Sequence, residues 1–222
     1  MLITFEGVDG SGKTTTASLV AGRLTSAGVP TRLMAKRTPL LQDEFARVQL
    51  TALARQIWGR PKNAPLVDLG PDYWLHLNAA YFAGLHRALT TELGSAGVAV
   101  YDNWIHKFVA RIATGDDLPL DRALTVLDAL PRPDRVFLLD VPPAVAAARK
   151  PVITLAERGG LQPGDWTFES FQSAVRSNLL RMADHLGWTV IVPGQRTPDE
   201  IADEVAADVM SMVSQRLTIS NS

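Results

Sequence analysis

The 222-residue sequence contains no cysteine. That absence excludes disulfides, cysteine zinc sites, iron–sulfur clusters and a cysteine nucleophile. Charge of one sign is not in large excess either, because the formal net charge is −1, and so no global basic field indicates nucleic-acid or membrane-surface binding. No run approaches about 18 apolar residues without a charge, and we therefore expect no membrane span.

The amino-terminal segment MLITFEGVDG lacks the basic region and the long apolar region of a secretory signal. With no cysteine and no such signal, the expected location is the cytoplasm. The composition is otherwise that of a globular protein, with 46% hydrophobic and 20% charged residues. The basic residues divide unevenly into 17 Arg and 5 Lys. Most of these arginines fall on expected helix faces, which indicates compositional background rather than a set of phosphate contacts.

Short, continuously apolar segments alternate with segments of helical periodicity along the chain. The expected strands cover residues 2–6, 31–35, 98–101, 135–140 and 188–192. The expected helices cover residues 13–27, 40–58, 72–93, 104–130 with a break near 115–119, 142–149, 166–186 and 198–213. This alternation predicts an α/β protein of three layers, with a central parallel sheet of about five strands covered on both faces. No break in composition marks a second domain, so we expect one domain over residues 1–222.

One motif carries clear chemistry. The segment from Gly7 to Thr14, GVDGSGKT, fits the P-loop pattern G-x-x-x-x-G-K-[ST] and stands between the first expected strand and the first expected helix. Its backbone N–H groups and the helix N-terminus suit a bound phosphate, Lys13 suits the β- and γ-phosphates, and the Thr14 hydroxyl suits Mg²⁺. The residues expected to bind ATP are Gly7, Asp9, Gly10, Ser11, Gly12, Lys13, Thr14 and Thr15.

A P-loop alone does not separate kinases, GTPases and motor ATPases. The chain has no N-K-x-D guanine motif, which disfavours a Ras-like GTPase, and no long apolar run ending in Asp-Glu, as many ATPase machines have. Its small size and the arginine-containing, glycine-rich segment at about 150–165 favour a small-molecule kinase with a mobile lid.

Three segments resemble the thymidylate kinase family of P-loop nucleoside monophosphate kinases. They are ITFEGVDGSGKTT (3–15), PRPDRVFLLDVPPAVAAARK (131–150) and FESFQSAVRSNLLRMAD (168–184). Together they cover about a third of the chain in the order and spacing of the family. The first segment is specific to the family, and the other two are moderately so.

The resemblance implies roles for residues that match the family motifs. Asp9 matches an acidic residue that contacts the acceptor sugar, and Arg37 matches an arginine that binds the acceptor phosphate. Asp102 matches the aspartate of the D-R-[YH] motif near metal and phosphates. Arg158, and after it Arg149, match lid arginines that supply transition-state charge. With Lys13, these two arginines and Asp102 are the expected catalytic residues, and Thr14 and Asp102 the expected metal ligands.

The acceptor motifs depart from the family pattern. D-R-[YH] reads Asp102-Asn103-Trp104, so one acceptor-site arginine is missing, and R-E-P-G reads RTPL from Arg37 onward. In the helix that carries the family's base-contacting arginine, the nearest matches are Tyr81 and Phe82, which we expect to line the base pocket. Two cations stand one and two turns after Asn103. These residues, Lys107 and Arg111, are candidates to replace the missing arginine.

The sequence thus predicts an ATP- and Mg²⁺-dependent kinase of a nucleoside monophosphate, which is thymidylate or a modified pyrimidine or deoxynucleotide. Two alternatives stay open: a kinase of a nucleoside or another small hydroxyl compound, and a nucleotide-binding regulator without catalysis. The expected partners are the nucleotide substrate and a second copy of the chain, because family members are commonly dimers and the helices at 40–58 and 72–93 are apolar. Nucleic acid and membrane are not expected partners.

Overall fold

A computed structural model describes residues 1–34, 39–59, 61, 66–94, 96–115, 117–160 and 164–220. Five strands form one parallel sheet in the order β2-β3-β1-β4-β5. Their bounds are β1 Leu2–Glu6, β2 Thr31–Met34, β3 Val98–Tyr101, β4 Arg135–Leu139 and β5 Thr189–Ile191. The predicted α/β class and parallel five-stranded sheet are therefore confirmed.

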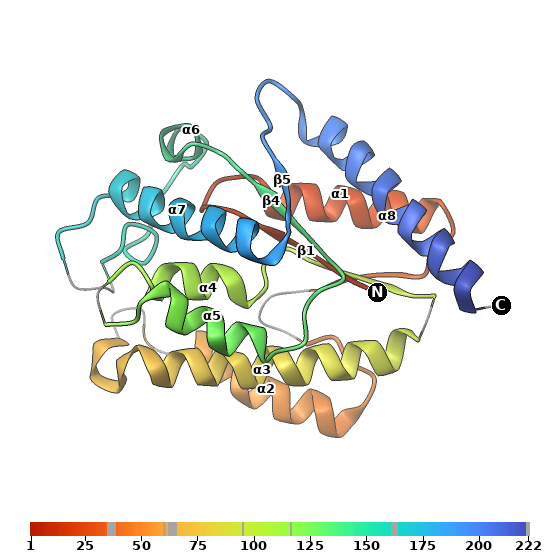
Figure 1. The fold of residues 1–222 in the computed structure, drawn as a ribbon, viewed down its shortest axis with the longest axis horizontal. Helices are drawn as coiled ribbons and strands as arrows, with labels where there is room; N and C mark the ends of the chain where they lie inside the picture. The colour runs from red at the N-terminus through yellow and green to blue at the C-terminus, as the bar shows by residue number, and fades with distance from the viewer. Residues whose placement is uncertain are drawn as a thin grey trace.

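Helices cover both faces of the sheet (Figure 1). One face carries α1 and α8, which pack against each other, and the other carries the remaining long helices. The α-helices are α1 Lys13–Ser26, α2 Glu44–Trp58, α3 Gly70–Leu93, α4 Ile105–Ile112, α5 Leu120–Asp128, α6 Pro143–Ala148, α7 Phe168–Leu186 and α8 Pro198–Ser220. A short 3-10 helix, η1 Leu66–Leu69, precedes α3.

Alternation along the strands divides the core into two parts. Ile3 and Phe5 of β1 point to the face covered by α1 and α8, whereas Leu2 points to the face covered by α2, α3, α4, α5 and α7. All these side chains are almost completely buried. Burial on both faces explains why the three central strands β3, β1 and β4 read as largely apolar runs, whereas the edge strand β2 contains Arg32 and is less buried.

Several helix ends differ from the expected bounds: α2, for example, begins at Glu44 instead of residue 40, where the Asp43 side chain accepts the N–H of Ala46. Helix α8 continues to Ser220 instead of ending at residue 213, because no glycine or proline interrupts the last two turns. Helix α3 begins at Gly70, with Pro71 in its first turn, and follows η1 within a segment that was expected to be loop. The predicted break near residues 115–119 is present, because α4 ends at Ile112 and α5 begins at Leu120.

Candidate active site

The turn after β1 follows the path that a P-loop requires. Gly10 and Gly12 have φ angles of 87° and 95°, which favour glycine over residues with a side chain. At Gly10 the space is also closed, because an added Cβ would lie 2.6 Å from the carbonyl oxygen of Ala146 in α6. Helix α1 begins directly afterwards at Lys13, so its free N–H groups and partial positive charge face the turn.

Lys13 is buried at the centre of this turn. Its Nζ donates hydrogen bonds to the Val8 carbonyl oxygen at 2.7 Å and to Ser11 Oγ at 3.2 Å. Both partners lie within five residues of Lys13 in the sequence. These local contacts hold the ammonium group over the loop, in the position that suits the outer phosphates of a nucleotide.

Asp102 follows β3 and lies beside the start of α1 because β3 and β1 are neighbours in the parallel sheet. The Thr14 hydroxyl donates a hydrogen bond to Asp102 Oδ2 at 2.7 Å, whereas the buried Oδ1 of Asp102 has no hydrogen-bond partner among the described residues. A hydroxyl beside a carboxylate with an unused oxygen fits Mg²⁺, which commonly takes one or two protein ligands and completes its shell with phosphates and water. Within the described residues no cluster of three His, Cys, Asp or Glu side chains offers an alternative metal site.

The turn that carries Asp102 is anchored to β1 by Glu6. This carboxylate is fully buried, and its Oε1 accepts the backbone N–H of Trp104 at 3.0 Å and lies 3.1 Å from His106 Nδ1. His106 is itself buried and its ring lies against Trp188, with ring centroids 4.6 Å apart. Because Glu6 immediately precedes the P-loop, it ties the β3–α4 turn to the phosphate-binding loop.

A second charged cluster centres on Asp9, inside the P-loop. Lys107 Nζ lies 2.5 Å from Asp9 Oδ1, and Arg111 lies 3.5 Å from Oδ2, which also accepts a hydrogen bond from Gln172 at 3.1 Å. Burial opposes ionisation of Asp9, but the charges of Lys107, Arg111 and Lys13 outweigh it, so the pKa of Asp9 lies well below its ordinary value. Asp9 is a carboxylate at any physiological pH.

The lid segment joins the same cluster. Arg111 also donates a hydrogen bond to the Ala156 carbonyl, and Lys150 pairs with Glu157 at 2.9 Å. Burial opposes ionisation of Glu157, but hydrogen bonds from Thr154 and Lys150 favour it, so the pKa of Glu157 lies below its ordinary value. In this arrangement Lys150 of the lid and the two cations of α4, Lys107 and Arg111, are already paired with carboxylates.

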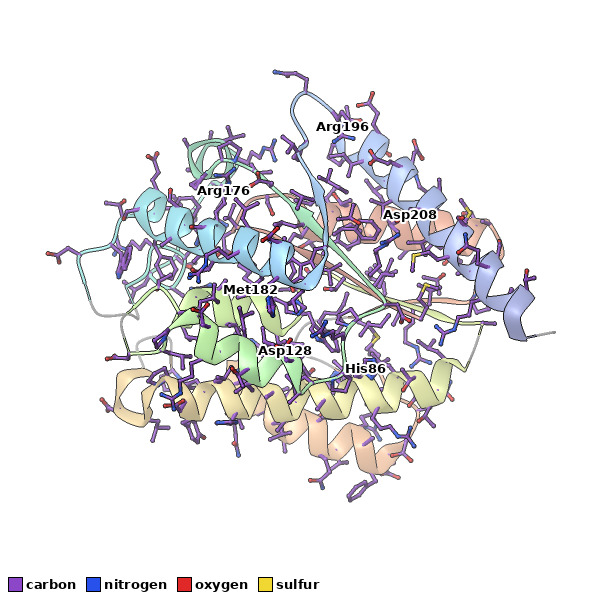
Figure 2. The ribbon with its side chains drawn as sticks, in the orientation of Figure 1. His86, Asp128, Arg176, Met182, Arg196 and Asp208 are labelled. Carbon is purple, nitrogen blue, oxygen red and sulfur yellow. The ribbon has the colours of Figure 1, made fainter. Side chains whose placement is uncertain are left out.

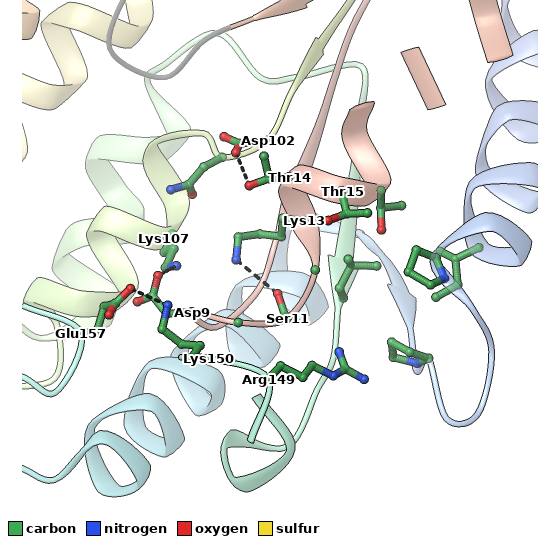
Figure 3. Close-up of a pocket in the computed structure, with 18 of the residues that line it drawn as sticks. Asp9, Ser11, Lys13, Thr14, Thr15, Asp102, Lys107, Arg149, Lys150 and Glu157 are labelled. Atoms are coloured by element: carbon green, nitrogen blue, oxygen red, sulfur yellow. Dashed lines mark hydrogen bonds and ion pairs between the residues drawn. The ribbon is translucent and has the colours of Figure 1, made fainter. Parts of the chain in front are cut away.

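A cavity of about 670 Å³ joins the P-loop, the β3–α4 turn, the lid and the loop before α8. This size suits a nucleotide-sized ligand. Figure 3 shows Asp9, Lys107, Lys150 and Glu157 together on one side of Lys13, with Asp102 beside Thr14 and Arg149 near the other end of the P-loop. The lining residues are Asp9–Thr16, Asp102, Asn103, Lys107, Leu139, Arg149, Lys150, Glu157, Pro193, Arg196, Pro198 and Ile201.

The predicted site residues other than Tyr81 and Phe82 divide into three groups. Those that line the cavity are Asp9, Gly10, Ser11, Gly12, Lys13, Thr14, Thr15, Asp102, Lys107 and Arg149. Three others lie elsewhere: Gly7 starts the turn, Arg111 reaches the cluster through Asp9, and Arg158 is exposed and outside the cavity lining. Arg37 lies outside the described residues.

Tyr81 and Phe82 do not line the cavity, which corrects the expectation that they form a base pocket. They are 0% and 2% exposed and belong to the core between α3, α2 and the sheet. Tyr81 packs edge-on against Trp58, and Phe82 lies 4.7 Å from the Trp104 ring. The face of α3 that carries them is turned toward the sheet, and burial of such large rings is strongly favourable there.

Four charged or amide residues of the cavity or of the Asp9 cluster were not predicted to lie there from the sequence. Lys150 and Glu157 lie in the predicted lid, but nothing in their local sequence indicates that they pair. Gln172 stands in the amphipathic pattern of α7 among core positions. Arg196 lies on the loop between β5 and α8 (Figure 2), and it pairs with Glu204 of α8 at 2.5 Å. Of these, Gln172 contacts residues far away in the sequence, Asp9 and Glu157, whereas the ion pairs of Lys150 and Arg196 are with residues seven and eight positions away.

Among the described residues, no helix is both long enough and apolar enough to cross a membrane.

No protein-family model matches the chain. The chain is 30% identical over 215 residues to "Thymidylate kinase" of Dinoroseobacter shibae, covering 93% of this chain and 94% of that protein. It is 28% identical over 220 residues to "Thymidylate kinase" of Xanthomonas campestris pv. campestris, covering 99% and 87%. It is 26% identical over 224 residues to "Probable thymidylate kinase" of Pyrobaculum aerophilum, covering 95% and 97%.

Proposed function

This chain belongs to the thymidylate kinase family, and on that premise we propose that it transfers the γ-phosphoryl group of ATP to a nucleoside monophosphate. The observation that carries the proposal is the pairing of the Thr14 hydroxyl with Asp102 at the P-loop, in one cavity with the lid residue Arg149. This combination places phosphate-binding, metal-binding and charge-neutralising groups around one space.

At the donor end, the P-loop backbone and Lys13 hold the ATP phosphates. Thr14 and Asp102 would hold Mg²⁺, which neutralises charge on the phosphates when it is bound. Asp102 Oδ1 is the group on which this assignment rests, because a buried carboxylate oxygen without a hydrogen bond is costly unless a cation uses it.

The lid supplies the remaining positive charge. Arg149 lines the cavity next to the P-loop, and Arg158 reaches the transferring group when the lid closes over the substrates. The reaction needs no protein nucleophile, because positioning and charge neutralisation account for most of phosphoryl-transfer catalysis.

At the acceptor end, Asp9 with Lys107 and Arg111 forms the floor of the sugar and phosphate site, and Arg37 contributes to the acceptor phosphate. Asn103 stands where the family motif has arginine, so the pair of cations on α4 takes over its charge. The acceptor is therefore thymidylate or a modified pyrimidine or deoxynucleotide.

A panel of nucleoside monophosphates assayed with ATP tests the proposal. We expect at least one of them to give ADP and a nucleoside diphosphate, with Lys13→Ala as the inactive control. If ATP binds and no monophosphate on the panel is phosphorylated, the proposed reaction is wrong and a regulatory role without catalysis becomes the better interpretation.

One observation favours a second candidate, a kinase of a nucleoside or another small hydroxyl compound. Lys107 and Arg111 are paired with Asp9, and Lys150 is paired with Glu157, so an incoming phosphate must compete with carboxylates for each of these cations. In this second candidate, Asp102 Oδ1 would accept the proton of the acceptor hydroxyl instead of binding Mg²⁺. Nucleosides on the same panel separate the two candidates.

We also propose a homodimer that uses the outer face of α2. Phe45 and Val48 on that helix are 75% and 52% exposed, which is high for large apolar side chains. Sedimentation of the wild type and of Phe45→Glu tests this: we expect a dimer that the charged variant dissociates. A monomeric wild type would contradict it.

A further inference from the structure

Gln172 is a buried amide that joins three separate segments. It lies near the start of α7 and is 0% exposed. Its Oε1 accepts the backbone N–H of Asp9 at 3.0 Å, and its Nε2 donates to Asp9 Oδ2 at 3.1 Å and to the Glu157 carbonyl oxygen at 2.7 Å. One side chain therefore contacts both the backbone and the carboxylate of Asp9, and the backbone of the lid.

This arrangement needs an amide. Asp9 offers a hydrogen-bond donor, its backbone N–H, and an acceptor, its carboxylate. Only a side chain that carries both an acceptor and a donor can bond to both. A carboxylate in place of Gln172 would lose the donor, and an apolar side chain of the same size would leave polar groups on both the P-loop and the lid without partners.

Gln172 also decides how the Asp9 carboxylate is oriented. Lys107 contacts Oδ1 and Gln172 contacts Oδ2, while Arg111 lies farther from Oδ2 at 3.5 Å. Without the Gln172 contact, Oδ2 keeps only the longer contact with Arg111, so rotation of the carboxylate about its last bond is less restrained while Oδ1 keeps its ion pair with Lys107. The side of Asp9 that faces the cavity would then vary.

The neighbouring residues support the lid at the same place. An added Cβ at Gly159 would lie 2.8 Å from Phe171 Cδ2, and the Phe171 ring packs against Trp166 with centroids 5.6 Å apart. The start of α7 is therefore in direct contact with the lid, and Gln172 provides its hydrogen bond to the lid backbone.

We infer that Gln172 is a positioning residue, which couples the orientation of Asp9 in the P-loop to the position of the lid at Glu157. Gln172 is not among the residues that line the cavity. For its kinetic consequence the inference rests on the proposed function, since Asp9 then faces the acceptor and the lid covers the transfer.

The test compares Gln172→Met with Asn178→Leu as a matched control. Asn178 is also a buried amide on α7, 9% exposed, but it donates only to the carbonyl oxygens of Ala110 and Ala113 and contacts neither the P-loop nor the lid. Both variants lose hydrogen bonds of a buried amide, so both are expected to lose stability. Only Gln172→Met breaks the proposed coupling.

We expect Gln172→Met to lower kcat by about 10²-fold, because small misplacement of reacting groups has an effect of that order. The KM for ATP should change by less than about twofold, and so should both parameters of Asn178→Leu. Amide hydrogen exchange over residues 154–160 should become faster in Gln172→Met and stay unchanged in Asn178→Leu. Unchanged kcat and unchanged lid exchange in Gln172→Met would overturn the inference.

Gln172→Glu gives an independent readout if the methionine variant does not fold. It keeps the size of the side chain but faces the Asp9 carboxylate and the Glu157 carbonyl with oxygen, so lid exchange should rise at least as much. Lid exchange equal to that of the wild type would contradict the coupling. The exchange measurement needs no substrate, and a wild type that phosphorylates nothing on the panel would therefore overturn the proposed function and leave the coupling to be judged separately.

Discussion

The proposed donor and acceptor ends of the cavity are built in different ways. At the donor end, Lys13 is held by Val8 and Ser11, which lie five and two residues away in the chain. At the acceptor end, Asp9 is held by Lys107 and Gln172, which lie 98 and 163 residues away. The contacts that hold Lys13 in the loop thus come from one short segment, whereas the Asp9 cluster, like the contact between Thr14 and Asp102, forms only after separate elements have packed.

This difference indicates where substrate preference can change. A P-loop that depends on its own backbone tolerates little variation, because its glycines occupy conformations that other residues rarely adopt. An acceptor site assembled from separate helices can exchange one side chain for another without disturbing the phosphate loop. The arrangement of Asn103, Lys107 and Arg111 is consistent with such an exchange.

The largest expected effect is at the donor end. Lys13→Ala should lower kcat by about 10³-fold, because it removes the preorganised cation at the outer phosphates. The measurement is ATP-dependent phosphorylation of the best monophosphate, with circular dichroism to show that the fold is retained. A folded variant with activity near that of the wild type would contradict the role of Lys13.

Variants of Arg149 and Arg158 test when positive charge reaches the transferred phosphoryl group. Either the arginine is already in place in this structure, or it arrives only when the lid closes. Arg158→Ala should lower kcat by about 10³-fold with little change in ATP affinity, since an arginine of this kind acts on the transition state. Arg149→Ala should weaken ATP binding as well, because Arg149 already lines the cavity. If Arg158→Ala changes only ATP affinity, the lid assignment is wrong.

At the acceptor end, the Asp9–Lys107 pair should contribute to stability. Lys107 is 5% exposed at its side chain, so Asp9→Asn leaves a buried cation with weaker partners, and the free energy of unfolding should fall by about 3 kcal/mol. The double variant Asp9→Asn with Lys107→Met should recover part of that loss. Chemical denaturation of the two single variants and the double variant measures the coupling.

The same pair predicts a pH dependence. The pKa of Asp9 in the folded protein lies below its ordinary value, so its stabilisation is complete above the ordinary aspartate pKa of about 3.9. It is lost as the pH falls toward the lower pKa of the folded protein. The stability difference between wild type and Asp9→Asn should therefore be constant near neutral pH and shrink only in acid; a difference that shrinks near pH 7 would contradict the assignment.

The smallest expected effect concerns acceptor choice. Asn103→Arg restores the residue of the family motif and should raise kcat/KM for thymidylate by about tenfold, within the range for one added charge-assisted contact. Asn103→Gln serves as the control, since it adds length without charge. No difference between the two variants would show that other residues of the acceptor site dominate.

Much of the fold was predictable from the sequence because it depends on local patterns. Continuous apolar strands such as residues 98–101 indicate a sheet buried on both faces, and the structure contains that strand with the predicted bounds. Helix α8 was predicted to end at residue 213. The sequence has no glycine or proline there, and the helix continues to Ser220. Helix ends depend on packing as well as on local signals, and they are therefore harder to predict than the elements themselves.

Sequence alone determined the phosphate-binding loop, since the spacing of glycine, lysine and threonine specifies its backbone path and the groups that line it. Tertiary structure alone decided the acceptor end. The sequence does not say that Tyr81 and Phe82 turn toward the core, nor that Lys107, Arg111 and Gln172 meet at Asp9. The physical reason is that these contacts depend on the rotation and packing of whole helices, which distant parts of the chain determine together.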